Sequence, residues 1–229
     1  MNSIAIIPAR GGSKRIPRKN IKLFFGTPII VYSIRAAIES KLFDEIIVST
    51  DDDEIAEIAC KFGASVPFRR SLENSGDFAT TASVIDEVLH RYAELNKYFI
   101  NCCCIYPAAP FISSEKLIIG YESLIKNKFN TVFPLVEHRP PIQRALKIFE
   151  DKIQMYFPQN INIRSQDLEK SYYDAGQFYW INVDSFLKEK NIYTNNSGGI
   201  IIRTNECQDI DDIFDWELAE LKFKLINKI

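Results

Sequence analysis

The chain has 229 residues, 46% of them hydrophobic, and a formal net charge of −2 at pH 7. This length and apolar content allow one large α/β domain with a full core. The near-neutral charge argues against a general nucleic-acid binder, in which basic charge spreads over a whole face. Apolar runs stay short of membrane length, and the N-terminus lacks a charged-then-apolar signal segment. We therefore expect a soluble cytoplasmic protein that binds neither nucleic acid nor membrane.

Strand-like apolar runs and helix-spaced apolar residues alternate along the first half of the chain. Strands are predicted at residues 4–8, 45–49, 64–67, 98–105 and 131–136. Helices are predicted at residues 28–40, 51–62, 84–92 and 117–125. This alternation predicts a mostly parallel sheet with helices on both faces, which is a three-layer αβα fold of the α/β class. Ligands then bind beyond the carboxyl ends of the strands.

The alternation stops near His138. Two apolar runs, at 145–149 and 152–157, flank a short acidic turn and predict a β-hairpin, and a polar irregular stretch follows. Strand character returns at 178–181 and 200–202, and a closing helix is predicted at 213–229. We expect a single domain over residues 1–229 with an inserted arm at about 138–172.

The five cysteines include three consecutive ones, Cys102-Cys103-Cys104, and no C-x-x-C pair. Adjacent residues of a strand point to opposite faces, so these three cannot converge on one metal ion. We interpret them as small buried residues of a central strand in a reduced protein.

The loop after the first strand carries the strongest chemical signal. Gly11 and Gly12 allow a sharp turn that exposes backbone N–H groups. The same stretch carries six basic residues with no acid between them: Arg10, Lys14, Arg15, Arg18, Lys19 and Lys22. Such a loop suits a polyphosphate, although its spacing is neither that of a P-loop nor that of a dinucleotide turn. A solvated basic loop is the alternative, and the strand before the loop favours phosphate.

Two acidic groups are candidates for a metal site. Asp209 and Asp211 face the same way on an extended segment and could hold Mg²⁺ together with substrate phosphates. The alternative is that acids here cap the last helix. For the cluster Asp51–Glu54, a helix N-terminus is the better interpretation.

Other segments admit two interpretations. Arg69 and Arg70 could reach a nucleotide or form a surface pair. The aromatic run 172–180 could be a platform for a sugar or part of the core.

Together these segments resemble the acylneuraminate cytidylyltransferases, or CMP-sialic acid synthetases, over essentially the whole chain. The motifs are residues 7–20, Ser49-Thr50-Asp51, Val66-Pro67-Phe68 with Arg70, Asp77 with Thr80 and Thr81, and Asp209-Ile210-Asp211. The resemblance implies a Rossmann-like nucleotidyltransferase fold, CTP as donor and Mg²⁺ as cofactor. It also implies a homodimer in which the β-rich arm reaches the neighbouring subunit.

One branch of this family is more similar than the rest. The segments 106–111, 141–146 and 173–180 are similar to those of enzymes that activate pseudaminic acid. Sialic acid enzymes generally carry Gln, which touches the acceptor sugar, where this chain has Tyr106. This departure argues against plain N-acetylneuraminate as the acceptor.

The resemblance implies a role for each matching residue. Lys14 and Arg10 would be catalytic, and Asp209 and Asp211 would bind the metal. The nucleotide would meet Ala9, Arg10, Gly11, Ser13, Lys14, Lys19, Asn20, Arg70 and Thr80. The acceptor sugar would meet Tyr106, Gln143, Arg144 and Gln177.

The implied reaction is transfer of CMP from CTP to the anomeric hydroxyl of an acidic nine-carbon α-keto sugar, with release of pyrophosphate. Pseudaminic acid is the expected acceptor, and N-acetylneuraminate, legionaminate and 3-deoxy-manno-octulosonate stay open. A nucleotide-binding module without catalysis is the alternative from another class.

Overall fold

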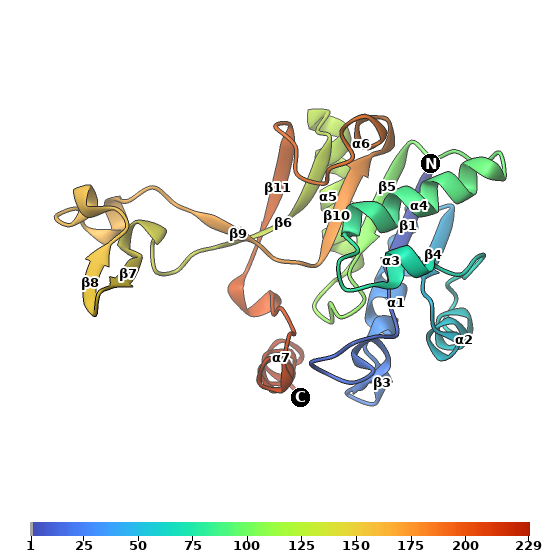
Figure 1. The fold of residues 1–229 in the computed structure, drawn as a ribbon, viewed down its shortest axis with the longest axis horizontal. Coiled ribbons are helices and arrows are strands. Elements are labelled where there is room, and N and C mark those ends of the chain that lie inside the picture. Colours follow the sequence, from blue (N-terminus) through green and yellow to red (C-terminus); the bar gives the residue numbers. More distant parts are fainter. Residues whose placement is uncertain (1) are drawn as a thin grey trace.

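The computed structural model describes residues 2–229, and a seven-stranded sheet forms the centre of the protein (Figure 1). Its main path follows the order β11-β6-β10-β5-β1-β4, and β9 pairs with β6 beside this path. The strands are β1 (Ser3–Pro8), β4 (Glu45–Ser49), β5 (Asn101–Ile105), β6 (Thr131–Glu137), β9 (Tyr172–Asp174), β10 (Phe178–Asn182) and β11 (Ser197–Ile202).

Helices cover both faces of this sheet. They are α1 (Ile30–Ser40), α2 (Asp53–Lys61), α3 (Leu72–Ser75), α4 (Thr81–Glu94), α5 (Ser114–Asn127), α6 (Val183–Glu189) and α7 (Ile213–Asn227). Side chains of β1 alternate between the layers: Ala5 and Ile7 join the core under α1 and α5, whereas Ile4 and Ile6 join the core under α4 and α6. The predicted three-layer αβα fold is confirmed. No helix within residues 2–229 has the length and apolar character needed to cross a lipid bilayer.

The consecutive cysteines lie at the centre of β5. Cys103 packs in the α1/α5 core, whereas Cys102 and Cys104 pack in the α4/α6 core. All three are fully buried, and burial raises the pKa of each thiol. Their interpretation as core residues is therefore correct.

The sheet is mixed, with mostly parallel strands and an antiparallel β10 between β6 and β5. β1 pairs in parallel with β4 and β5, and β11 pairs in parallel with β6. β10 runs antiparallel to β5 and β6, and β9 runs antiparallel to β6. The chain leaves the sheet after β6 and returns through β9 and β10. Because no crossover helix lies in this return path, the strands run in the opposite direction.

Two predicted strand boundaries are wrong. The predicted strand 64–67 is only an isolated bridge between Ser65 and Ile47, because the proline that follows cannot donate to a ladder. The predicted strand 98–105 begins at Asn101, where burial begins.

The helix predicted from residue 28 begins at Ile30. Residue 28 instead belongs to a small hairpin of β2 (Leu23–Phe24) and β3 (Thr27–Pro28) ahead of this helix.

Residues 138–171 form an arm that protrudes from the side of the sheet (Figure 1). Its tip carries the predicted hairpin, formed by β7 (Leu146–Phe149) and β8 (Lys152–Met155). Glu150 and Asp151 form the turn, and both have positive φ, at 49° and 57°, as a tight hairpin requires. All the residues of β7 are exposed, so the apolar side chains of this strand do not contribute to the core.

Gly120 marks a close contact between α5 and β10. A Cβ at this position would come within 2.9 Å of ring atoms of Phe178 and Trp180. We predict that Gly120→Ala destabilises the protein, because overpacking costs about 1–3 kcal/mol and the gain in helix propensity is about 1 kcal/mol. The midpoint of urea unfolding measures the difference, with Lys126→Ala on the exposed face of the same helix as control. A Gly120→Ala protein more stable than wild type would contradict the packing argument.

Candidate active site

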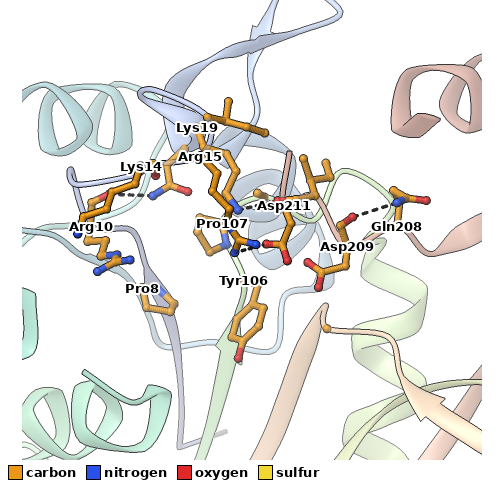
Figure 2. A pocket seen from close by; sticks show the side chains of 16 residues that line it. Pro8, Arg10, Lys14, Arg15, Lys19, Tyr106, Pro107, Gln208, Asp209 and Asp211 are labelled. Carbon is orange, nitrogen blue, oxygen red and sulfur yellow. Dashed lines mark hydrogen bonds and ion pairs between the residues drawn. The ribbon is translucent and has the colours of Figure 1, made fainter. Parts of the chain in front are cut away.

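A cavity of about 220 Å³ lies beyond the carboxyl ends of β1 and β5 (Figure 2). Segments far apart in the sequence meet there: the loop after β1, the residues after β5, Gly176 and the segment before α7. The lining residues are Pro8, Arg10, Ser13, Lys14, Arg15, Ile16, Lys19, Asn20, Tyr106, Pro107, Ala108, Gly176, Gln208, Asp209, Ile210 and Asp211. This is the end of the sheet at which the sequence predicted a ligand site.

The cavity brings the basic loop and the distant carboxylates together. Lys14 and Asp211 both line it, as a shared nucleotide site requires. Arg15 donates from Nη2 to Asp211 Oδ1 at 2.6 Å, and Lys19 donates from Nζ to the carbonyl of Ile210 at 2.7 Å. Burial lowers the pKa of Lys19, against the opposing effect of the nearby carboxylates. Contacts between the two segments thus form one wall of the cavity.

Asp77 neutralises the two cations for which the family resemblance implies a catalytic role. Arg10 Nη1 donates to Asp77 Oδ1 at 2.9 Å and to the Gly76 carbonyl at 3.1 Å, and Lys14 pairs with the other carboxylate oxygen. The bond from Lys14, followed by that from Arg10, lowers the pKa of the Asp77 carboxyl. A carboxylate therefore contacts both groups that would bind phosphate. Before the structure, Asp77 was identified only as part of a family motif.

The acidic cluster after β4 supports the basic loop. Gly11 donates its N–H to Asp51 at 2.9 Å, and Arg18 pairs with Asp52 and Glu54. Asp52 also caps α2, because its Oδ1 accepts from the N–H of the third residue of the helix at 3.0 Å. The preferred interpretation of this cluster as a helix N-terminus is correct, and the cluster also anchors the loop.

The backbone of the loop approaches the Asp52 side chain closely at Gly11, where a Cβ would lie 2.7 Å from an oxygen of Asp52. Gly11 is not among the residues that line the cavity, and neither are three other residues predicted to bind nucleotide. Ala9 is buried and donates its N–H to Ser49. Arg70 is also buried, and its Nε donates to Ser49 Oγ at 3.0 Å.

Burial lowers the pKa of the Arg70 guanidinium. The third residue, Thr80, caps α4 by accepting from the N–H of Ser83 at 3.0 Å.

In the segment before α7, one aspartate caps the helix and two others line the cavity. Asp212 caps the helix, and its Oδ1 accepts from the N–H of Asp215 at 2.9 Å. Asp209 and Asp211 line the cavity instead. Desolvation and the charge of Asp211 raise the pKa of Asp209, a conflict that a cation between the two carboxylates would relieve.

Paired carboxylates are oxygen donors that fit Mg²⁺. Within residues 2–229 no group of three or more His, Cys, Asp or Glu side chains is placed to hold a metal. Water and substrate phosphates would therefore complete the coordination.

The residues predicted to bind the sugar are divided. Tyr106 lines the cavity, its hydroxyl lies 3.0 Å from Thr81 Oγ1, and its ring packs on Tyr179. Gln177 is buried beside the cavity and donates from Nε2 to the carbonyl of Glu206 at 2.6 Å. Its Oε1 is buried without a hydrogen-bond partner in the described part of the chain.

Gln143 and Arg144 lie in the arm. Gln143 donates to the carbonyl of Glu169 at 2.9 Å, and Arg144 donates to the carbonyl of Ile161 at 3.0 Å. The fold does not bring these two side chains to the lining of the cavity.

Sequence reasoning assigned no role to several lining residues. Arg15 stood in the basic run, but nothing in the sequence showed that it pairs with Asp211. Gly176 and Gln208 gave no local signal, because their positions depend on how the strands return to the sheet.

A sequence model of the family described as cytidylyltransferase matches residues 4–227. The chain belongs to this family. It is 40% identical over 226 residues to the pseudaminic acid cytidylyltransferase of Campylobacter jejuni, covering 98% of this chain and 97% of the relative. It is 28% identical to the CMP-N,N'-diacetyllegionaminic acid synthase of Legionella pneumophila, covering 98% of this chain and 97% of that enzyme.

Among solved structures, a CMP:2-keto-3-deoxy-manno-octonic acid synthetase complexed with CTP superposes with a TM-score of 0.73. The match covers 100% of both chains at 13% identity, and it supports the fold. The cytidylyltransferase is a CTP-dependent nucleotidyltransferase, as the resemblance predicted.

The exposed pairs at Asp77 should compete with phosphate. Exposed ion pairs are weak and easily exchanged, so we predict that Asp77→Asn, which frees Arg10 and Lys14, tightens binding of inorganic tripolyphosphate by up to about tenfold. Isothermal titration calorimetry measures the dissociation constant. Asp53→Asn is the matched control, because that carboxylate pairs with Arg69 outside the cavity. Unchanged or weaker binding by Asp77→Asn would refute competition.

Proposed function

We propose that this cytidylyltransferase transfers CMP from CTP to the anomeric hydroxyl of pseudaminic acid and releases pyrophosphate. The observation that carries the proposal is the shared cavity, in which Lys14 and Asp211 come together although they lie at opposite ends of the chain. The acceptor is supported by the 40% identity to a pseudaminic acid cytidylyltransferase over nearly the whole chain. It is also supported by Tyr106, which stands where sialic acid enzymes generally have Gln.

The reaction forms a bond between the anomeric oxygen and the α-phosphorus and breaks the bond from that phosphorus to the bridging oxygen. Pyrophosphate leaves with the bridging oxygen, and the proton of the anomeric hydroxyl passes to solvent. Charge crowding and alignment dominate the barrier, so preorganised cations matter more than proton transfer. Lys14 and Arg10 exchange Asp77 for phosphate oxygens, and Lys19 and Arg15 contribute positive charge on the side of the carboxylates. Mg²⁺ held by Asp209 and Asp211 would neutralise phosphate charge.

The acceptor end of the cavity is assigned to Tyr106 and the turn around Gly176. This end carries less positive charge than the loop end, where the triphosphate would lie. Gln177 follows Gly176 in the chain, and its buried Oε1, which has no hydrogen-bond partner within residues 2–229, is a candidate acceptor for a sugar hydroxyl. All five cysteines are free in the described part of the chain. Free cysteines support a reduced cytoplasmic location for this chemistry.

The protein is further proposed to act as a homodimer whose arms reach the neighbouring subunits. The arm tip exposes Ile148 by 77%, Ile153 by 72% and Phe149 by 58%, an apolar surface that a monomer would leave in water. Gln143 and Arg144, at the base of the hairpin, would then meet the sugar in the partner's cavity.

A panel of acceptor sugars tests the proposed reaction. With CTP and Mg²⁺, we expect pyrophosphate release to be fastest with pseudaminic acid and slower with legionaminic acid and N-acetylneuraminate. Lys14→Ala and Asp211→Ala should each reduce turnover about 100-fold or more while circular dichroism stays unchanged. CTP binding without pyrophosphate release for any sugar would favour a non-catalytic nucleotide-binding module.

Sedimentation velocity tests the dimer. The double variant Ile148→Asp and Ile153→Asp should sediment as a monomer where wild type sediments as a dimer, because burying two carboxylates in an apolar interface is strongly unfavourable. Leu72→Asp is the control, since Leu72 is equally apolar and 92% exposed outside the arm. A monomeric wild type, or a double variant that remains dimeric, would exclude the arm as the interface.

A further inference from the structure

The segment 207–212 carries both carboxylates of the cavity without regular secondary structure of its own. It connects a short 3₁₀ turn (Thr204–Glu206) to α7 and pairs with none of the described strands. Asp209 and Asp211 can keep a fixed spacing only if other groups hold the backbone between and around them. The neighbouring helix, α7, supplies such groups from two positions.

Asp215, in the first turn of α7, holds the C-terminal part of this segment. Its Oδ2 accepts from the backbone N–H of Asp211 at 3.0 Å and from that of Asp212 at 3.2 Å. These two hydrogen bonds fix the backbone on which the Asp211 side chain stands. They satisfy two N–H groups ahead of the helix, and both are strengthened by the charge of the Asp215 carboxylate.

Lys222, two helical turns further on, holds the N-terminal part. Its Nζ donates to the carbonyl of Cys207 at 2.7 Å. Residues spaced by two turns lie on the same face of a helix, so Asp215 and Lys222 both face the segment. The two charges thus fix the backbone on either side of Asp209.

Gln208 connects the two charged residues. Its amide donates from Nε2 to Asp215 Oδ1 at 3.1 Å, and its Oε1 accepts from Lys222 Nζ at 2.8 Å. The donor end of the amide meets the carboxylate and the acceptor end meets the ammonium, so both contacts are electrostatically matched. The same Nε2 donates to the carbonyl of Asp209 at 3.0 Å, which Figure 2 shows beside the cavity.

Packing of α7 against the segment does not by itself require these hydrogen bonds. Apolar side chains at the same places would dock α7 equally well, whereas these groups contact backbone atoms of the residues that precede, carry and follow the carboxylates. Groups that orient metal ligands from behind typically change metal affinity or activity 10- to 100-fold when removed.

We propose that Lys222, Gln208 and Asp215 form a clamp that sets the spacing of Asp209 and Asp211 and thereby the affinity for the divalent cation. The inference rests on the metal role assigned to those two carboxylates under the proposed function. Lys222 and Asp215 are positioning residues, since neither lines the cavity, and Gln208 lines the cavity while its amide contacts both of them.

The test measures metal binding separately from turnover. Mn²⁺ is titrated into the enzyme with CTP and without sugar, and bound Mn²⁺ is followed by EPR against an enzyme-free Mn–CTP reference. Lys222→Met should weaken Mn²⁺ binding about tenfold or more and raise the Mg²⁺ concentration for half-maximal turnover by the same factor. Excess Mg²⁺ should restore turnover to near the wild-type value.

Two control variants and a second clamp variant sharpen the result. Lys222→Arg keeps the charge and the donors and should bind Mn²⁺ like wild type. Lys228→Met removes a lysine just beyond the end of the same helix and should change nothing. Gln208→Leu removes the connecting amide and should weaken Mn²⁺ binding even if Lys222→Met fails to fold.

The outcomes separate the clamp from the metal role itself. If wild type binds no Mn²⁺ and turns over without divalent cation, the metal role in the proposed function is wrong. If wild type binds Mn²⁺ and both Lys222→Met and Gln208→Leu bind it equally well, the clamp is wrong and the metal role stands. Lost turnover that excess Mg²⁺ does not restore would also overturn the clamp, because it would show a role in folding alone.

Discussion

Charge balance within one cavity is the constraint on which the rest of this structure depends. A short loop with many cations repels itself unless anions are close to them. Asp77 balances Arg10 and Lys14, and Asp211 balances Arg15. These pairs are largely exposed, so they cost little to exchange for phosphate. The loop is therefore ordered in advance for a polyanion that replaces carboxylates with stronger charge.

The fold makes this balance possible by where it ends its strands. β1 lies between β4 and β5, so the loop after β1 opens next to the turn after β5. The antiparallel return through β9 and β10 brings Gly176 and, further along, the segment before α7 to the same edge. One face of the cavity thus comes from parallel βαβ units and the other from the returning chain.

Local patterns in the sequence were enough for the layers and for the chemistry of the loop. Periodicity identified the main strands and helices, and alternation explained the cysteines of β5, because these signals depend on neighbours in the chain. The strand prediction failed at residues 64–67, where a β-like composition yields a single bridge. Arg70 and Thr80 matched family motifs, but neither lines the cavity: Arg70 makes a buried bond to Ser49, and Thr80 caps a helix.

By itself the sequence determined which side chains could bind a triphosphate and a divalent cation, because residue type and spacing fix charge, donors and local conformation. Only the tertiary structure decided their partners. Arg15 and Asp211 are 196 residues apart, and Lys14 and Asp77 are 63 apart, yet each pair is in contact. No local pattern encodes such pairs, since they exist only when packing of the sheet and its helices brings the segments to one edge.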